Sequence, residues 1–381
     1  MKLSKDMENY AASSEQEALA ILRELVVIPA PSHHEDQRAA FIKKWFEDNG
    51  ISDVSIDPAL NVVCRYNVTD DNDLVMFMAH TDTVFPAETK LEITERDGKW
   101  YCPAIGDDTA QLVNLMIAAR YFVQNKIRAK TGILFVANSC EEGLGDLKGS
   151  RQLNRDYGNR LKAVISFDAP DIDYVMNTVI GSHRYRISLK TEGGHSFADF
   201  GNMNAIRYAA SLIDTLYTVK VPVDGDSTTT YNVGTISGGQ SVNSIAAACE
   251  FLYEYRSSSK KLLLQMENIF YKLIDTYREM GVDIEVSRVG ERPCMGDVDP
   301  ESQAALSKIV EDSVREIVGK EPRYMPGSGD ANIPLDNGIP ALQAGGVHTD
   351  GAHKLTEWID PSSMLTGIRH EMNVMAHFFE L

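Results

Sequence analysis

The first 180 residues alternate apolar runs with amphipathic segments, and this alternation limits the folds that are open to the chain. Strand-like runs occupy 74–79, 132–138 and 162–167, and helical patterns occupy 15–28 and 110–124. Strands that alternate with helices are typical of a sheet covered by helices on both faces. The sequence therefore predicts an α/β domain with a doubly wound mixed sheet.

A different order of elements begins near Ser182. Strand-like and helical segments follow one another as β-α-β-β-α-β, which is typical of a small α+β sandwich. After Pro293 the helix–strand alternation resumes and completes the first sheet. We therefore expect a discontinuous first domain, 1–180 with 293–381, and an inserted α+β domain, 181–292. The segments lie at 183–193, 204–219, 229–238, 247–257, 261–280 and 282–289, and then at 303–318, 340–346 and from about Pro361.

The charge balance argues against two classes of partner. The chain carries 37 Lys and Arg against 55 Asp and Glu, a formal net charge of -18. An acidic surface repels polyphosphate and anionic lipid headgroups. We therefore expect binding neither to nucleic acid nor to a membrane surface.

The sequence shows no pattern of a membrane span or a secretory signal. Residues 1–16 are too polar for the apolar core of a signal peptide, and no later apolar run approaches the roughly 18 residues that span a bilayer. The five cysteines are scattered without a C-x-x-C pair, which argues against a disulfide framework and against a thiolate zinc site. We expect a cytoplasmic protein with reduced, mostly buried thiols.

Histidines and acidic residues follow the predicted strands of the first domain. In an open α/β sheet, loops at the carboxyl ends of the strands gather side chains from distant positions, and ligands collect there. We therefore expect these residues to share one site. They are His80 and Asp82, Asp107 and Asp108, Glu141 and Glu142, Asp168, and His353.

Two imidazoles and a surplus of carboxylates in one cleft repel one another unless cations lie among them, because an unpaired buried charge is costly. Imidazole and carboxylate without thiolate suit Zn²⁺, with Mn²⁺ or Co²⁺ as alternatives. Two such ions, roughly 3.5 to 4 Å apart, polarise a carbonyl and lower the pKa of a bridging water. One of the adjacent residues Glu141 and Glu142 can then ligate a metal while the other accepts a proton from that water.

The order of these motifs along nearly the whole chain resembles the co-catalytic zinc exopeptidase family. This family includes peptidase T, carboxypeptidase G, aminoacylase and the acetylornithine and succinyl-diaminopimelate deacylases. The chain looks most similar to the peptidase T-like branch. The motifs are "HTDTV", "GDDTA", "EEGLGDLKG", "SFDAP", "EGGHSFADFGN", "SVNSIAAACEFLYEYRS", "GSGDANI" and "GAHKLTEWID".

The resemblance implies a role for each residue at the strand ends. Glu141 is the general base, and the carboxylate of Asp82 orients the imidazole of His80. The resemblance also implies a cis peptide bond between Asp107 and Asp108. The implied ligands are His80, Asp107 and Asp168 for one metal, and Asp107 as a bridge, Glu142 and His353 for the other. Because "AHKLTEW" fits the family pattern, we prefer His353 to His348, which lies five residues earlier.

The inserted domain resembles the family's lid and dimerisation domain, so we expect a homodimer formed through it. His195 matches the histidine that stabilises the oxyanion in a neighbouring subunit. Asn243 and Arg256 match positions that hold the substrate's carboxylate or backbone, although Arg256 can also pair with Glu254. Asp330 matches a position near the cleft whose role stays open.

Two departures from the family pattern concern specificity. Thr109 and Gln111 replace the lysine and the glycine of "DDKAG", and Phe197 replaces the small residue after "GGHS". We expect a dinuclear zinc exopeptidase that hydrolyses small peptides. The alternative is a metal-dependent deacylase or carboxypeptidase for N-acyl or N-carbamoyl amino acids. A third hypothesis is a non-catalytic binding module, against which Glu141 argues.

Overall fold

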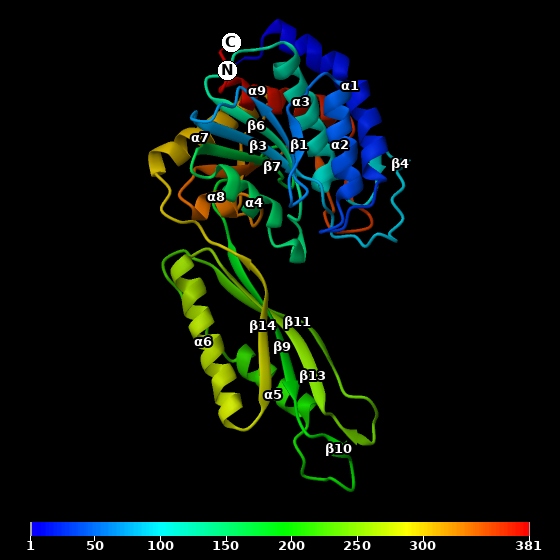
Figure 1. Cartoon of the computed structure of the whole chain (residues 1–381), viewed down its shortest axis with the longest axis vertical. Helices are drawn as coiled ribbons and strands as arrows, with labels where there is room; N and C mark the ends of the chain where they lie inside the picture. Colours follow the sequence, from blue (N-terminus) through cyan, green and yellow to red (C-terminus); the bar gives the residue numbers. More distant parts are fainter. Residues whose placement is uncertain (1, 381) are drawn as a thin grey trace. The chain divides into compact units, whose positions relative to one another are not determined.

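The computed structural model describes residues 2–380 and divides the chain into two compact units. One unit contains the chain up to Val179 and again from Gly296 onward, and it is called the catalytic-type unit after the family resemblance above. The other, the inserted unit, is Ile180–Met295. Figure 1 shows the blue-to-green and the orange-to-red parts of the chain within the same unit. The inserted unit thus interrupts a fold that the end of the chain completes.

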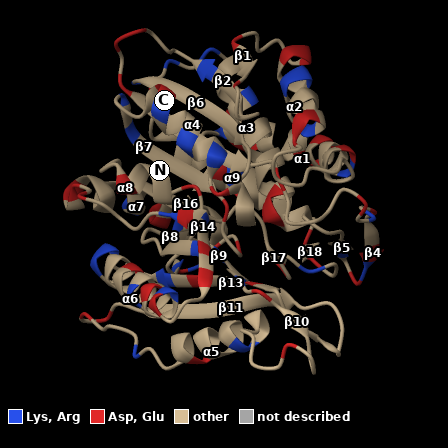
Figure 2. Ribbon diagram, turned by 60° about the horizontal axis from the view of Figure 1, so that its bottom comes forward, with Lys and Arg blue, Asp and Glu red and all other residues tan. Residues whose placement is uncertain are grey.

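An eight-stranded mixed sheet forms the centre of the catalytic-type unit. Its inner strands β6, β3, β7 and β16 run parallel, whereas β2 is antiparallel to β6 and β8 is antiparallel to β16. Strands β3 and β6 are buried throughout and carry no Lys, Arg, Asp or Glu. The ribbon of β6 is accordingly tan in Figure 2. The strand order is β1 (Val54–Ile56), β2 (Val62–Tyr66), β6 (Gly132–Asn138), β3 (Leu74–His80), β7 (Leu161–Phe167), β16 (Ala341–Ala344), β8 (Tyr174–Met176) and β15 (Arg323–Tyr324).

Helices cover both faces of this sheet (Figure 1), which confirms the predicted doubly wound α/β class. Val75, Phe77 and Ala79 of β3 pack into the main apolar core with α1, α3 and α9. Met76 and Met78 point to the opposite face, where they meet α4 and α8. The helices are α1 (Lys5–Val26), α2 (Asp36–Asp48), α3 (Gln111–Gln124), α4 (Lys148–Tyr157), α7 (Pro300–Ser313), α8 (Asn332–Asp336) and α9 (Ser363–Ala376).

A small antiparallel sheet lies beside the helical turn η1 (Ile105–Ala110), which leads into α3. Its strands come from two distant parts of the chain, since β4 and β5 precede η1 and β17 and β18 belong to the C-terminal part. This sheet therefore joins the loop of Asp107 to the loop of His353. The order is β17 (Thr349–Asp350), β18 (Trp358–Ile359), β5 (Lys99–Tyr101) and β4 (Thr94–Arg96).

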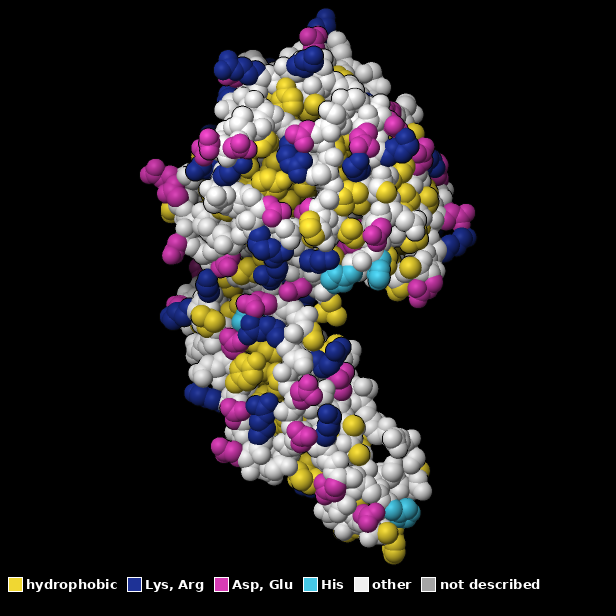
Figure 3. All heavy atoms as spheres, in the orientation of Figure 1, with side chains coloured by type: hydrophobic (Ala, Val, Ile, Leu, Met, Phe, Trp, Pro, Cys, Tyr) yellow, Lys and Arg dark blue, Asp and Glu magenta, His cyan; other side chains and the backbone are white. Residues whose placement is uncertain are grey.

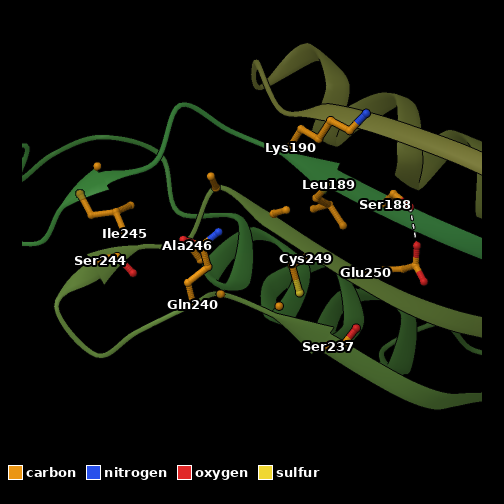
Figure 4. A pocket seen from close by; sticks show the side chains of 15 residues that line it. Ser188, Leu189, Lys190, Ser237, Gln240, Ser244, Ile245, Ala246, Cys249 and Glu250 are labelled. Atoms are coloured by element: carbon orange, nitrogen blue, oxygen red, sulfur yellow. Dashed lines mark hydrogen bonds between the residues drawn. The ribbon is translucent and has the colours of Figure 1, made fainter.

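The inserted unit has the predicted order of elements, with two short strands added. Its antiparallel sheet buries one face against α5 (Ala205–Tyr217) and α6 (Lys260–Glu279). The other face is more polar, and part of it lines a cavity of about 620 Å³ with Ser188, Lys190 and Glu250 (Figure 4). The sheet order is β11 (Thr229–Gly238), β13 (Ala248–Ser257), β9 (Gly181–Lys190) and β14 (Asp283–Arg292), and β10 (Gly194–His195) pairs with β12 (Ser244–Ile245).

Charged side chains lie on the surface of the structure, and the cysteines lie inside it. Acidic and basic side chains are interspersed over the visible face of each unit (Figure 3). No helix within residues 2–380 combines the length and the apolar character needed to cross a bilayer. All five cysteines are buried and none forms a disulfide, which confirms the predicted free thiols.

Glu371 of α9 is a fully buried acid, and neither of its carboxyl oxygens has a hydrogen-bond partner within the described chain. Burial raises the pKa of Glu371 well above its ordinary value. The folded state therefore holds a proton that the unfolded state releases near pH 4.5, so this group's contribution to stability declines as the pH rises above that value.

We expect Glu371→Gln to remove this contribution to the pH dependence. The free energy of unfolding of the metal-free wild type should fall more steeply with pH, by up to about 1.4 kcal/mol per pH unit for this one proton. Urea unfolding at a series of pH values above 4.5 measures the difference, with the exposed Glu279→Gln as control. Equal slopes for wild type and Glu371→Gln would contradict a neutral Glu371.

Candidate metal centre

His80 ends β3 at the edge of the sheet where the carboxyl ends of the parallel strands meet. Its Nε2 lies 3.0 Å from Asp107 Oδ1, and its Nδ1 lies 3.0 Å from the main-chain oxygen of Asp82. Burial opposes a positive charge on the imidazole, but the carboxylates of Asp107 and Asp82 outweigh it and raise the pKa of His80 well above its ordinary value. The imidazole is thus held between two aspartates.

Asp107 lies in η1, directly before α3. The peptide bond between Asp107 and Asp108 is cis, as the family resemblance implies. Asp107 Oδ2 lies 3.3 Å from His353 Nε2, so its carboxylate stands between the imidazoles of His80 and His353. Burial disfavours the negative charge, yet the hydrogen bonds to both histidines lower the pKa of Asp107 below its ordinary value. Asp107 is therefore an ionised carboxylate shared by two histidines.

Glu142 and His353 meet on the other side of Asp107. Glu142 Oε1 lies 2.9 Å from His353 Nε2. The hydrogen bonds to Asp107 and Glu142 raise the pKa of His353 to about 11, and burial together with the charge of Asp107 raises the pKa of Glu142 to about 7. His80, Asp107 and Glu142 each offer one ligand atom, and these atoms lie within 4.8 Å of one another. This spacing is compatible with a bound metal ion.

Asp168 follows β7 and adds a further acid to the cluster. Gln343 Nε2 donates hydrogen bonds to its carboxylate, at 2.8 Å, and to its main-chain oxygen, at 2.9 Å. Burial raises the pKa of Asp168 to about 8, and the neighbouring acids add to this effect although His80 opposes it. A cation bound among these acids would oppose that shift, because it favours the charged form of each carboxyl.

Asp82 is fully buried and joins two strand-end loops. Its carboxylate accepts the main-chain N–H groups of Glu141, at 2.9 Å, and of Glu142, at 3.0 Å, and the hydroxyl of Ser32, at 2.7 Å. The same carboxylate lies 3.5 Å from His80 Nδ1, which is longer than the 3.0 Å contact of its main-chain oxygen. Asp82 therefore fixes the main chain of the two glutamates as well as the imidazole of His80.

Glu357 is a functional candidate that the sequence interpretation did not assign. Its buried carboxylate accepts the main-chain N–H groups of Ala104, Gly106 and Asp107. Burial and then the charge of Asp107 raise the pKa of Glu357 to about 8, whereas the three N–H groups oppose that shift. Its place four residues after His353, within "AHKLTEW", is the only sequence signal.

Asp330 is likewise buried at the edge of the acidic cluster. Asn138, the last residue of β6, donates a hydrogen bond of 2.5 Å from Nδ2 to its carboxylate. Burial raises the pKa of Asp330 well above its ordinary value, and the charge of Glu141 adds to the effect. Asp330 is thus a buried acid that the last residue of β6 holds near the cluster.

His348 and His353 occupy different surroundings. His348 Nδ1 lies 2.7 Å from Asp171 Oδ1, whereas His353 contacts Asp107 and Glu142. The geometry therefore favours His353 as the histidine of the cluster.

The remaining three predicted site residues belong to the inserted unit. His195 pairs with Ser244 in the short β10–β12 ladder, and Ser196 N–H donates to Asn243 O at 3.0 Å, so His195 and Asn243 lie together. Arg256 lies near the opposite end of β13 and makes two hydrogen bonds to Glu254, at 3.0 and 3.1 Å. The ion pair that was the alternative for Arg256 is thus formed.

The chain is similar to known proteins over most of its length. Residues 76–377 match the model of Peptidase family M20/M25/M40. The protein YqjE of Bacillus subtilis (strain 168) is 26% identical over 352 residues, which are 86% of this chain and 90% of YqjE.

Solved structures share the fold at low sequence identity. The aminopeptidase PepT of Bacillus cereus is 21% identical with a TM-score of 0.71, covering 94% of this chain and 97% of PepT. A tripeptidase of Staphylococcus aureus is 23% identical with a TM-score of 0.74, covering 96% and 98%. The dipeptidase Dug1p of Saccharomyces cerevisiae is 15% identical with a TM-score of 0.76, covering 98% of both chains.

The family model spans most of the chain, including every residue of the cluster around Asp107. Both the resemblance and the predicted fold are therefore confirmed. This chain belongs to Peptidase family M20/M25/M40 and is a metal-dependent hydrolase that acts on peptide bonds.

Proposed function

We propose that this chain is a dinuclear zinc exopeptidase that removes residues from the N-terminus of small peptides. The observation that carries the proposal is the position of Asp107 between His80 and His353, with Glu142 bonded to the same His353. Imidazole and carboxylate ligands without thiolate suit Zn²⁺, and Mn²⁺ and Co²⁺ are the alternatives. The names tripeptidase and aminopeptidase PepT, carried by two proteins of the same fold, support a small peptide as substrate.

The proposed ligand sets divide the cluster around the shared carboxylate of Asp107. His80 and Asp168 complete the first set, and Glu142 and His353 complete the second. Asp168 supports this division, because a carboxyl with a pKa of about 8 becomes a good ligand once a cation lowers that pKa. Two bound ions would polarise the scissile carbonyl and lower the pKa of a water between them.

Glu141 is the proposed proton carrier. The contact between its main-chain N–H and Asp82 Oδ1, at 2.9 Å, holds the loop in place beside Glu142. In the proposed mechanism the Glu141 carboxylate takes a proton from the attacking water and delivers it to the leaving amine. Of the two adjacent glutamates, Glu142 is thus the proposed metal ligand and Glu141 the residue that transfers the proton.

A substrate screen tests the reaction class. Zinc-loaded protein is assayed against dipeptides, tripeptides and N-acetyl amino acids, and the new amino groups are identified by mass spectrometry. Release of N-terminal residues from tripeptides supports the proposal. Hydrolysis of N-acetyl amino acids alone would support the deacylase hypothesis. No hydrolysis in any panel would leave the non-catalytic binding module as the remaining hypothesis.

The inserted unit supports a proposed homodimer. Strand β11 lies at the edge of its sheet with most of its residues exposed, and an exposed edge can pair with another copy of itself. We propose that His195 of one copy stabilises the oxyanion in the other, with Asn243 and Arg256 as substrate contacts. The cytoplasmic location stays a prediction.

We expect His195→Ala to lower kcat by about 10²–10³-fold, the usual cost of one lost oxyanion donor, without loss of metal. Mixing His195→Ala with Glu141→Gln separates action in trans from action in cis. In a mixed dimer, the Glu141→Gln copy can lend its His195 to the intact base of the other copy. Recovery of activity on mixing supports the shared site, whereas two inactive proteins that stay inactive although they exchange subunits would exclude it.

A further inference from the structure

The carboxylate of Glu357 is buried against the main chain that carries Asp107. Glu357 Oε1 accepts the N–H groups of Gly106, at 2.7 Å, and of Asp107, at 2.8 Å. Its Oε2 accepts the N–H of Ala104 at 3.0 Å. Both oxygens are thus occupied by main-chain donors.

These donors lie at the start of η1, which leads into α3 after a kink at Asp107, where φ is -110° and ψ is 89°. The first N–H groups of a helix have no partner within the helix, and a negative charge is favourable at that end. The side chain of Ala104, the residue before η1, cannot accept these N–H groups, so a carboxylate about 250 residues later in the chain satisfies them. Glu357 therefore caps this helix from a distant loop.

The same loop also carries His353, and the small sheet ties it further to the chain before η1. Cys102 N–H donates to the main-chain oxygen of Glu357 at 3.1 Å, and Trp358 pairs with Tyr101. Strands β17, β18, β5 and β4 lie side by side in Figure 2. The main chains that lead to Asp107 and His353 are thus parts of one hydrogen-bonded assembly.

Gly106 shows how closely this assembly is packed. A Cβ atom built on Gly106 would lie 1.9 Å from Oγ1 of Thr349 in β17. The main chain beside Asp107 therefore has little room to shift toward β17. The hydrogen bonds from the N–H groups of Gly106 and Asp107 to Glu357 hold the same segment in place.

We propose that Glu357 is a positioning residue: it fixes the Asp107 main chain against the His353 loop, so that both side chains reach the same divalent cation. This inference rests on the metal centre of the proposed function. Residues that orient metal ligands typically change metal affinity by about 10–100-fold when they are replaced. Glu357 acts on a ligand's main chain, and the same order of effect is expected.

The test replaces Glu357 with Gln in the full-length chain and uses Co²⁺ as the probe. The amide keeps the size of the side chain but presents an NH₂ group to main-chain N–H donors, so at least one hydrogen bond is lost. We expect Co²⁺ binding to weaken by about 10–100-fold, with an altered visible absorption spectrum of the bound ion. In the zinc-loaded enzyme kcat should fall more than KM changes, because the substrate contacts stay in place.

A second variant and a matched control complete the experiment. Glu357→Asp keeps the carboxyl group and shortens its reach by one methylene, so its Co²⁺ affinity should lie between those of wild type and Glu357→Gln. This variant replaces Glu357→Gln in the test if the Gln variant does not fold. Glu92→Gln removes an exposed carboxylate of the loop before β4, which pairs with Lys90, and should bind Co²⁺ as wild type does.

The outcomes distinguish this inference from the proposed function. Folded Glu357 variants with the Co²⁺ affinity and spectrum of wild type would overturn the positioning role, even if their melting temperature is lower. A wild-type chain that binds neither Co²⁺ nor Zn²⁺ would overturn the metal centre itself. Weakened binding with an altered spectrum in the Glu357 variants alone supports the inference.

Discussion

Glu141→Gln is expected to lower kcat by about 10²–10⁴-fold, the range that a general base contributes, while the metal content stays at the wild-type level. The amide has nearly the shape of the carboxylate but cannot take a proton from water. The hydrogen bond from the main-chain N–H of residue 141 to Asp82 does not depend on the side chain and is kept. Loop geometry and ligands are therefore preserved, and only the proton transfer is lost.

Steady-state kinetics and metal analysis of the same preparation measure both halves of this expectation. Glu88→Gln is the matched control, because it removes an exposed carboxylate from the segment that follows β3 and should leave kcat unchanged. Unchanged kcat in Glu141→Gln would remove this residue from the mechanism. Loss of metal together with activity would instead place Glu141 among the ligands.

Asp107→Asn is expected to remove most of the bound metal and, with it, the hydrolysis. Its carboxylate meets His80 on one side and His353 on the other, at 3.0 and 3.3 Å, so its charge serves both proposed ions. The loss of this one charge should therefore weaken the binding of both ions. The loss of affinity should exceed the roughly 10–100-fold that follows when a residue that orients a metal ligand is replaced. Metal content after dialysis, by mass spectrometry, and titration with Zn²⁺ measure the effect.

The histidine pair supplies a matched control for this expectation. His353→Ala should lose metal, whereas His348→Ala, which removes the partner of Asp171, should keep it. Loss of metal in His348→Ala with retention in His353→Ala would reverse the assignment. Two ions retained in Asp107→Asn would contradict the shared carboxylate.

The sequence predicts the framework because its strongest patterns are local. The uncharged runs that form β3 and β6 favour buried strands. The polar residues directly after these parallel strands then lie at the same edge of the sheet. The predicted first helix begins at residue 15, whereas α1 begins at Lys5. Its stripe of buried residues extends back to Met7, and Ser4 caps the helix by accepting the N–H of Met7. The prediction from 15 onward found only its second half.

Three helices of the catalytic-type unit have no counterpart in the prediction: α2, α4 and the five-residue α8. The reasons for α4 and α2 differ. Helix α4 is strongly polar and buries small residues, since a Cβ on Gly149 would lie 2.3 Å from the main-chain oxygen of Ser139. Its contacts are close approaches of the main chain, which apolar periodicity does not reveal. Helix α2 does carry the spacing of a buried stripe, in Ala39, Ile42 and Phe46, although no helix is predicted there.

The contacts that organise the candidate site depend on pairs of residues far apart in the chain. Asp82 holds the main chain of Glu141, 59 residues later, and Glu357 holds that of Asp107, 250 residues earlier. Nothing in the local sequence specifies which N–H group a carboxylate will accept. The resemblance named the side chains of the cluster, but only the fold shows what fixes their main chains.

The position of the insertion has a consequence for biosynthesis. Four of the proposed ligands precede the inserted unit, whereas His353 follows it on the segment after β16, which pairs with β7. A chain still emerging from the ribosome therefore lacks part of the proposed centre until the segment that carries His353 has been made. A product shortened before His353 would therefore lack one of the five proposed ligands.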